Sequence, residues 1–155
     1  MIKYFLVFFM LFLSYNFVYS QNRVIRGMVV DDSPELYPII GVSVIINDSI
    51  NITETGADGS FQFETSLPVY KLSFSLVNYE RVDLMLLEKC NIVDVVMITD
   101  ATYDFMSYRK INKERRKKYK ELPKLHKKAY EKGVFQSLEP CYTREFVEWT
   151  KKRVP

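Results

Sequence analysis

The two cysteines are the residues of this sequence best suited to covalent chemistry. Cys90 and Cys141 are the only cysteines among 155 residues. In an oxidising compartment an even pair of cysteines can form a disulfide. Closing a loop of about 50 residues would stabilise the fold by about 4 kcal/mol on a chain-entropy model. We expect Cys90 and Cys141 to form this bridge if the chain is exported, and two buried free thiols are the alternative.

The single histidine has no sequence neighbours that would make it a catalytic base. His126 lies among Lys124, Lys127 and Lys128, which disfavour its protonation, and no adjacent acid would orient its ring. We expect an exposed histidine on a helix. The cysteines and the histidine lack zinc spacing, and no phosphate-binding glycine loop is present. The acids of residues 31–64 fall in expected turns, so the sequence predicts no catalytic, metal-binding or cofactor-binding residue.

Cations gather in the C-terminal third of the chain. Residues 104–155 hold sixteen Lys or Arg and seven Asp or Glu, a net charge of +9. Residues 21–103 hold five and twelve, a net charge of −7. The basic run could be a solvated helix face, neutralise the acidic half, or bind an anionic envelope surface, an acidic envelope protein or, least favoured in an exported chain, nucleic acid. The candidate residues for an anionic partner are Arg109, Lys110, Lys113, Arg115, Arg116, Lys117, Lys118 and Lys120.

Residues 1–20 have the pattern of a secretory signal peptide. Lys3 precedes ten consecutive apolar residues at positions 4–13, and Val18 and Ser20 suit cleavage before Gln21. A retained membrane anchor is the alternative, but a span needs about 20 predominantly apolar residues and polar side chains interrupt this one. We therefore expect export to the periplasm, the outer membrane or the cell surface, with no retained transmembrane segment.

The acidic half has the alternation and turn signals of β-structure. Phe61 and Phe63 fall on one face of one segment, and in another Leu72 and Phe74 are expected inward with Ser73 outward. Seven short strands separated by turn formers suggest two packed sheets. The expected strands are 24–30, 42–46, 50–55, 60–64, 70–76, 82–87 and 92–98.

The basic half has helical periodicity instead. Apolar positions recur at three- and four-residue steps after Asp104, a possible N-cap, and Pro123 is expected to end this first helix. A second helix is expected at 124–132, stopped by Gly133, and a third at 142–153. This half is therefore expected to be a short basic α-helical segment.

Four ordered motifs in the acidic half resemble a known family. These are IRGMVVD at 25–31, PIIGVSV at 38–44, TGADGSF at 55–61 and LVNYE at 76–80. In this order they resemble the carboxypeptidase regulatory-like domain. The resemblance covers about residues 23–98 and implies a seven-stranded transthyretin-like (prealbumin-like) β-sandwich. Members of this family are mostly accessory modules, some of them placed before TonB-dependent outer-membrane receptors.

Two residues depart from the family pattern. Gly56 stands where the family usually has Asp, and Asn78 stands where it usually has Gly. Asn tolerates left-handed backbone geometry better than most residues, so the second turn should be kept. The first change removes a carboxylate that would brace its loop.

These observations together predict a mainly β protein with three parts: a signal peptide at 1–20, a β-sandwich at 21–100 and a basic helical extension at 101–155. The expected function is that of an exported, non-catalytic accessory or binding protein of a bacterial cell envelope. A carbohydrate-binding module is the alternative, with Tyr37, Tyr70 and Tyr79 as the available aromatic residues. An enzyme of unknown type is a remote alternative.

Overall fold

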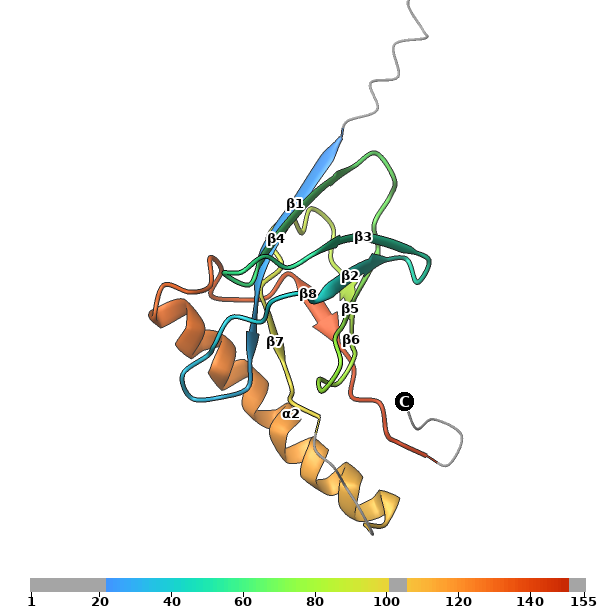
Figure 1. Cartoon of the computed structure of the whole chain (residues 1–155), viewed down its shortest axis with the longest axis vertical. Helices are drawn as coiled ribbons and strands as arrows, with labels where there is room; N and C mark the ends of the chain where they lie inside the picture. The colour runs from blue at the N-terminus through green and yellow to red at the C-terminus, as the bar shows by residue number, and fades with distance from the viewer. Residues whose placement is uncertain (1–21, 101–105, 151–155) are drawn as a thin grey trace, which may run out of the picture.

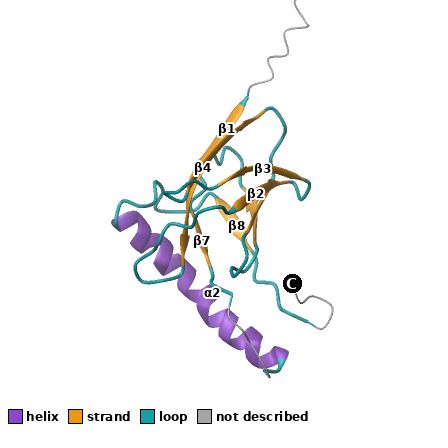
Figure 2. Cartoon of the chain, viewed as in Figure 1, coloured by secondary structure: helices purple, strands orange, loops and turns teal. Residues whose placement is uncertain are grey.

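The computed structural model describes residues 22–100 and 106–150 (Figure 1). This part of the chain forms strands and one long helix, coloured by type in Figure 2. In chain order the elements are β1 (Arg23–Asp31), β2 (Ser43–Ile46), β3 (Ile50–Glu54), β4 (Ser60–Thr65), β5 (Lys71–Ser75), β6 (Val82–Leu86), β7 (Val95–Met97), α2 (Tyr108–Glu131) and β8 (Tyr142–Arg144).

The strands form two sheets. The first has three strands in the order β4-β1-β7, with β1 antiparallel to β4 and parallel to β7. The second has five strands in the order β3-β2-β5-β6-β8, all antiparallel to their neighbours. The predicted mainly β class is confirmed. Each of the seven expected strands overlaps an observed one, and β8 is an addition.

One apolar core joins the two sheets. Phe61 and Phe63 from β4 and Leu72 and Phe74 from β5 are all buried in it, on the faces that their alternation predicts. The rings of Phe61 and Phe74 meet edge to face with their centroids 5.4 Å apart. Burial of large apolar side chains is the main favourable term in folding. This core is therefore what holds the two sheets together.

Ser73 lies outside the apolar core, on the outward face that its alternation predicts, but it is buried rather than solvent-exposed. It is 0% exposed, and its hydroxyl donates a 2.6 Å hydrogen bond to Asp83 Oδ1 on β6. Lys71 lies 3.7 Å from Asp83 Oδ2, and Arg81 contacts Oδ1 of the same carboxylate. A small polar residue is thus covered by a cross-strand ion-pair network, which alternation alone does not reveal.

Two turn positions within the quoted motifs have left-handed geometry, which the sequence predicted for Asn78. Gly59 has φ of +75°, and a Cβ there would lie 2.7 Å from the Val29 carbonyl oxygen. Asn78 has φ of +68°. Glycine is needed at the first position because a side chain would collide with β1, whereas asparagine is tolerated at the second.

The basic half contains one helix where two were expected. α2 runs through Pro123 without ending, and its N-cap is Ser107. The expected cap Asp104 lies outside the described residues. Proline costs a helix interior about 3 kcal/mol, but apolar residues on both sides of it, Leu122 and Ala129, pack against Val96 of β7 in a second core. This tertiary packing offsets the energetic cost of Pro123, so the helix continues.

The third expected helix is also wrong. Residues 142–144 form β8, which extends the five-stranded sheet beside β6. The chain then continues without helical structure to residue 150. The Leu87 amide donates to the Cys141 carbonyl, so the chain reaches the sheet edge already aligned as a strand. Residues 151–153 lie outside the described part.

Candidate functional site

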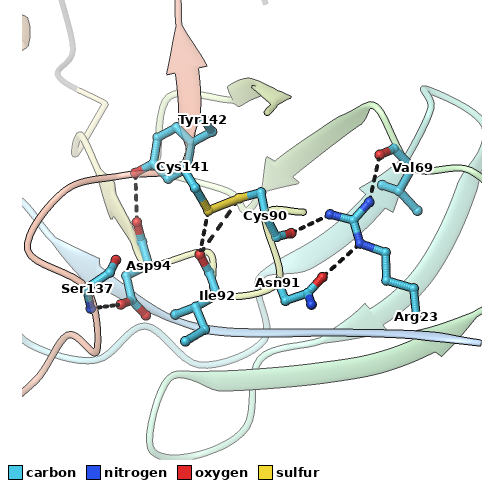
Figure 3. Close-up of a disulfide and its surroundings, with 9 residues drawn as sticks. All are labelled: Arg23, Val69, Cys90, Asn91, Ile92, Asp94, Ser137, Cys141 and Tyr142. Carbon is cyan, nitrogen blue, oxygen red and sulfur yellow. Dashed lines mark hydrogen bonds between the residues drawn. A yellow bond between two sulfur atoms is a disulfide. The ribbon is translucent and has the colours of Figure 1, made fainter. Parts of the chain in front are cut away.

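A disulfide ties the C-terminal segment to the sheets. The structure joins Cys90 and Cys141, the pair expected from the sequence, with Cα atoms 5.3 Å apart (Figure 3). Arg23 Nη2 donates to the Cys90 carbonyl at 2.6 Å, and the Tyr142 hydroxyl donates to the Asp94 carbonyl at 2.7 Å. The bonded sulfurs carry no thiolate, so this pair acts as a brace and not as a nucleophile.

Asp94 is a buried carboxylate that the sequence did not single out. Its Oδ1 accepts the Met28 amide at 3.1 Å, and its Oδ2 accepts the Gln136 and Ser137 amides at 2.8 and 3.3 Å. Burial raises the pKa of Asp94, although these three hydrogen bonds oppose the shift. One carboxylate therefore joins β1, the strand-7 region and the loop after α2. In the sequence, a single acid within the apolar run 92–98 could have indicated a buried carboxylate.

His126 is buried beside this loop, which corrects the expectation of an exposed histidine. Its Nε2 lies 3.0 Å from the Ser137 carbonyl oxygen and must donate to it, and its ring lies 4.9 Å from that of Phe135. Burial lowers the pKa of His126, which favours the neutral ring. Because Nε2 bonds a carbonyl and not the Ser137 hydroxyl, the arrangement does not activate a nucleophile.

Arg115 is not part of an exposed patch, which corrects its place among the candidate residues. Its Nε and Nη2 donate to the two carboxylate oxygens of Glu80 at 2.8 and 2.9 Å, and both side chains are buried. Nη1 donates to the Val147 carbonyl at 2.8 Å. The guanidinium also lies 4.6 Å from the Trp149 ring centroid. A buried arginine with this set of partners is structural.

Two further side chains of α2 bind the backbone of the C-terminal segment. Asn112 accepts the Trp149 amide at 2.9 Å and donates to the Trp149 carbonyl at 3.0 Å. The Tyr119 hydroxyl donates to the Glu145 carbonyl at 2.6 Å. With Arg115 these residues hold the segment 145–149 against the helix, and we call this side of α2 the inner face.

Lys118 and Lys128 also contact residues of the acidic half. Lys118 Nζ lies 3.3 Å from Asp32 Oδ2 and donates to the Thr99 carbonyl at 3.0 Å. Lys128 Nζ donates to the Pro34 carbonyl at 2.9 Å. Part of the basic charge therefore meets the acidic half directly. The idea that the two halves neutralise each other applies to Arg115 and Lys118, which reach carboxylates of the acidic half.

The remaining candidate cations form no ion pair or hydrogen bond with the described residues of the acidic half, and we call the side of α2 that carries them the outer face. They recur at helical spacing, so their side chains share one side of α2. Arg116 lies at the edge of this face, because it pairs with Glu148 and stacks on Phe146 of the C-terminal segment. Lys117 pairs with Glu114. Lys110 is exposed too. A hollow of about 390 Å³ is lined by Arg109, Lys113, Arg116, Lys117 and Lys120.

The exposed aromatic residues do not form one surface. Tyr37 and Tyr70 are 61% and 57% exposed. The Tyr37 carbonyl accepts the Asp31 amide at the end of β1, whereas Val69, next to Tyr70, contacts Arg23 at its start. Tyr79 is half-buried, and burial raises its pKa. Tyr37 and Tyr70 therefore do not form a shared aromatic platform.

Residues 22–100 and 106–150 contain no group of three or more His, Cys, Asp or Glu side chains that could hold a metal ion. Within the same ranges no helix is long and apolar enough to cross a membrane. No family model matches the chain, and no curated protein matches it in sequence.

Proposed function

We propose that this protein is an exported, non-catalytic binding protein of a bacterial cell envelope, and that the outer face of α2 binds an anionic envelope surface. Residues 23–98 are proposed to be a transthyretin-like sandwich of the carboxypeptidase regulatory-like kind, which serves as the scaffold. The two packed sheets and the left-handed turns at Gly59 and Asn78 support that assignment. The fold alone does not specify a function, and the charge distribution on α2 is what supports this one.

The observation that carries the proposal is the division of cations between the two faces of α2. Arg115 and Lys118 reach carboxylates of the acidic half. Arg109, Lys113 and Lys120 have no ion pair within 22–100 or 106–150 and line one hollow. Internal neutralisation therefore does not explain the outer cations. A surface of one charge sign attracts a partner of the other.

The polarity of the helix adds to this argument. The N-terminal end of a helix carries partial positive charge, so acidic residues are favoured in its first turn. α2 has no acidic residue there, and Arg109 occupies the second position of the helix. The charge of Arg109 therefore adds to the partial positive charge of the helix end. An anionic surface would be attracted to this positive potential.

Charge reversal on the outer face tests the proposal. Lys113→Glu/Lys120→Glu should abolish co-sedimentation of the purified protein with phosphatidylglycerol vesicles. Arg26→Glu/Lys89→Glu is the matched control, because it makes the same change in charge at exposed positions of the sheet region. This control should still sediment with the vesicles.

Salt supplies a second readout. Capture of the unmodified protein should weaken as salt rises from about 0.05 to 0.5 M, because the Debye length falls from more than about 10 Å to a few Å. Phosphatidylcholine vesicles, which carry no net charge, should not capture it. Capture that survives both the Lys113/Lys120 reversal and high salt would contradict an electrostatic surface on α2.

A further inference from the structure

A groove lined mostly by apolar residues lies on another side of α2 from the basic hollow. It encloses about 560 Å³ between the helix and the segment 138–144. Ligand pockets in proteins range from roughly 300 to 1,000 Å³ and are mostly apolar with a few convergent polar groups. The apolar part of this wall consists of Val96, Leu122, Pro123, Leu138, Pro140 and the rings of Tyr119 and Tyr142.

The charged residue that lines this groove without a carboxylate partner is Arg144. It is half-buried, its Nη1 donates to the Val96 carbonyl at 2.8 Å, and its guanidinium lies 4.8 Å from the Tyr119 ring centroid. Among residues 22–100 and 106–150, no carboxylate lies within ion-pair distance of it. Charges withdrawn from water are normally paired.

Arg115 shows what a satisfied arginine looks like in the same protein. It also stacks on aromatic rings and donates to a backbone carbonyl, but Glu80 neutralises it with two hydrogen bonds. Arg144 has the stacking and the carbonyl without the carboxylate. An anion that enters the groove would complete the same set of contacts.

The other charged residues around the groove do not neutralise the positive charge of Arg144. Lys127 lies on its wall, 3.8 Å from Glu131. Glu139 also lines the groove but is exposed and makes no ion pair with Arg144. His126 is the remaining titratable group of the wall besides the tyrosines. The groove therefore combines an apolar channel with one unneutralised guanidinium.

We propose that this groove binds a single-chain amphiphile with an anionic head, such as a medium-chain carboxylate. The carboxylate would take a bidentate position on Arg144, the geometry that guanidinium groups favour. The hydrocarbon chain would lie along Leu122 and Leu138. The proposal does not depend on binding by the outer face of α2, because the two sites share no cation.

Calorimetric titration of the purified protein with decanoate, below its micelle-forming concentration, tests the proposal. One decanoate should bind per chain. Decanol, which has the same chain without the charge, should bind at least about tenfold more weakly, because a charge-assisted hydrogen bond contributes roughly one to two powers of ten in affinity. Equal affinity for decanol would overturn the assignment of the head group to Arg144.

Two variants locate the site, each with a matched control. Arg144→Gln should weaken decanoate binding about tenfold or more, and Arg26→Gln, at an exposed arginine that does not line the groove, should not. Leu138→Trp should block the groove, whereas Leu87→Trp, at a similarly exposed leucine, should leave binding intact. If Arg144→Gln fails to fold, Leu138→Trp still decides the question.

The outer-face variant separates the two proposals. Lys113→Glu/Lys120→Glu should leave decanoate affinity unchanged although it abolishes capture by anionic vesicles. Decanoate binding that is lost with these lysines and retained by Leu138→Trp would place the anion on the outer face and overturn the groove site. Decanoate binding retained by both Arg144→Gln and Leu138→Trp would overturn it as well.

Discussion

The inner and outer faces of α2 carry the same kinds of cation but differ in what surrounds them. On the inner face Arg115 is enclosed by Glu80, aromatic rings and the C-terminal segment. On the outer face Lys113 and Lys120 are exposed beside other cations. The difference teaches that a basic run is not one functional unit. Its inner members belong to the fold, and its outer members are the ones to which we assign the proposed binding.

Breaking the Glu80–Arg115 pair should have the largest effect on stability. Glu80→Gln leaves a buried guanidinium without its counter-charge, and such a loss costs about 3 to 5 kcal/mol. Urea unfolding followed by circular dichroism measures it. Glu121→Gln, which removes an exposed carboxylate 3.9 Å from Lys124, should change stability by less than about 1 kcal/mol. Similar losses of stability in the two variants would mean that the buried pair contributes no more to stability than an exposed one.

The paired replacement sharpens the same point. Glu80→Met/Arg115→Met removes both charges and keeps apolar volume, so it should cost less than Glu80→Gln alone. A double variant that is as unstable as the single one would show that the geometry of the pair, rather than the isolated charge, is what the fold requires.

The disulfide should have the next largest effect, because it holds the segment that the inner face binds. Cys90→Ser/Cys141→Ser should lower the free energy of unfolding by about 2 to 4 kcal/mol. Intact mass before and after reduction and alkylation measures the redox state directly. Two alkylatable thiols in the native, unreduced protein would refute the bridge.

The pH dependence of stability should report on His126. Its folded-state pKa is lowered by burial, so the unfolded chain takes up the proton more readily. Stability should therefore be greatest above the unfolded pKa of about 6.5 and fall below it, by up to about 1.4 kcal/mol per pH unit. The raised pKa of Asp94 acts in the opposite direction, favouring the folded state as pH falls toward the ordinary carboxyl value of 3.8.

His126→Gln provides the control for this dependence. Glutamine can still donate to the Ser137 carbonyl but does not titrate. Urea unfolding of both proteins between about pH 5 and 8 should show a slope for the unmodified protein and a flatter line for the variant. Equal slopes would show that another group is responsible.

The sequence was sufficient for those features that local patterns determine. Alternation placed Phe61 and Phe74 in the core, and the tolerance of asparagine for left-handed geometry predicted the positive φ of Asn78. These features depend on residues a few positions apart. Alternation gave the outward direction of Ser73 but not its burial, because its partner, Asp83, comes from the neighbouring strand.

The basic half was harder for the same physical reason. Pro123 is a strong local signal to end a helix, but contacts of Leu122 and Ala129 with distant strands override it. Arg115 resembled its exposed neighbours in sequence, and only its position opposite Glu80 distinguishes it. The pairing of β8 with β6 likewise depends on residues about 60 positions apart.

The smallest expected change in stability is that of Arg109, and it has the opposite sign to the changes expected on the inner face. Arg109 lies in the first turn of α2, where a cation opposes the helix dipole and repels Lys113 one turn later. Arg109→Glu should therefore stabilise the protein by about 0.5 to 1 kcal/mol and weaken capture by anionic vesicles. Arg109→Gln should give roughly half of the gain. A residue whose removal improves stability and impairs binding is retained for the partner, whereas a loss of stability in Arg109→Glu would assign the outer face to the fold.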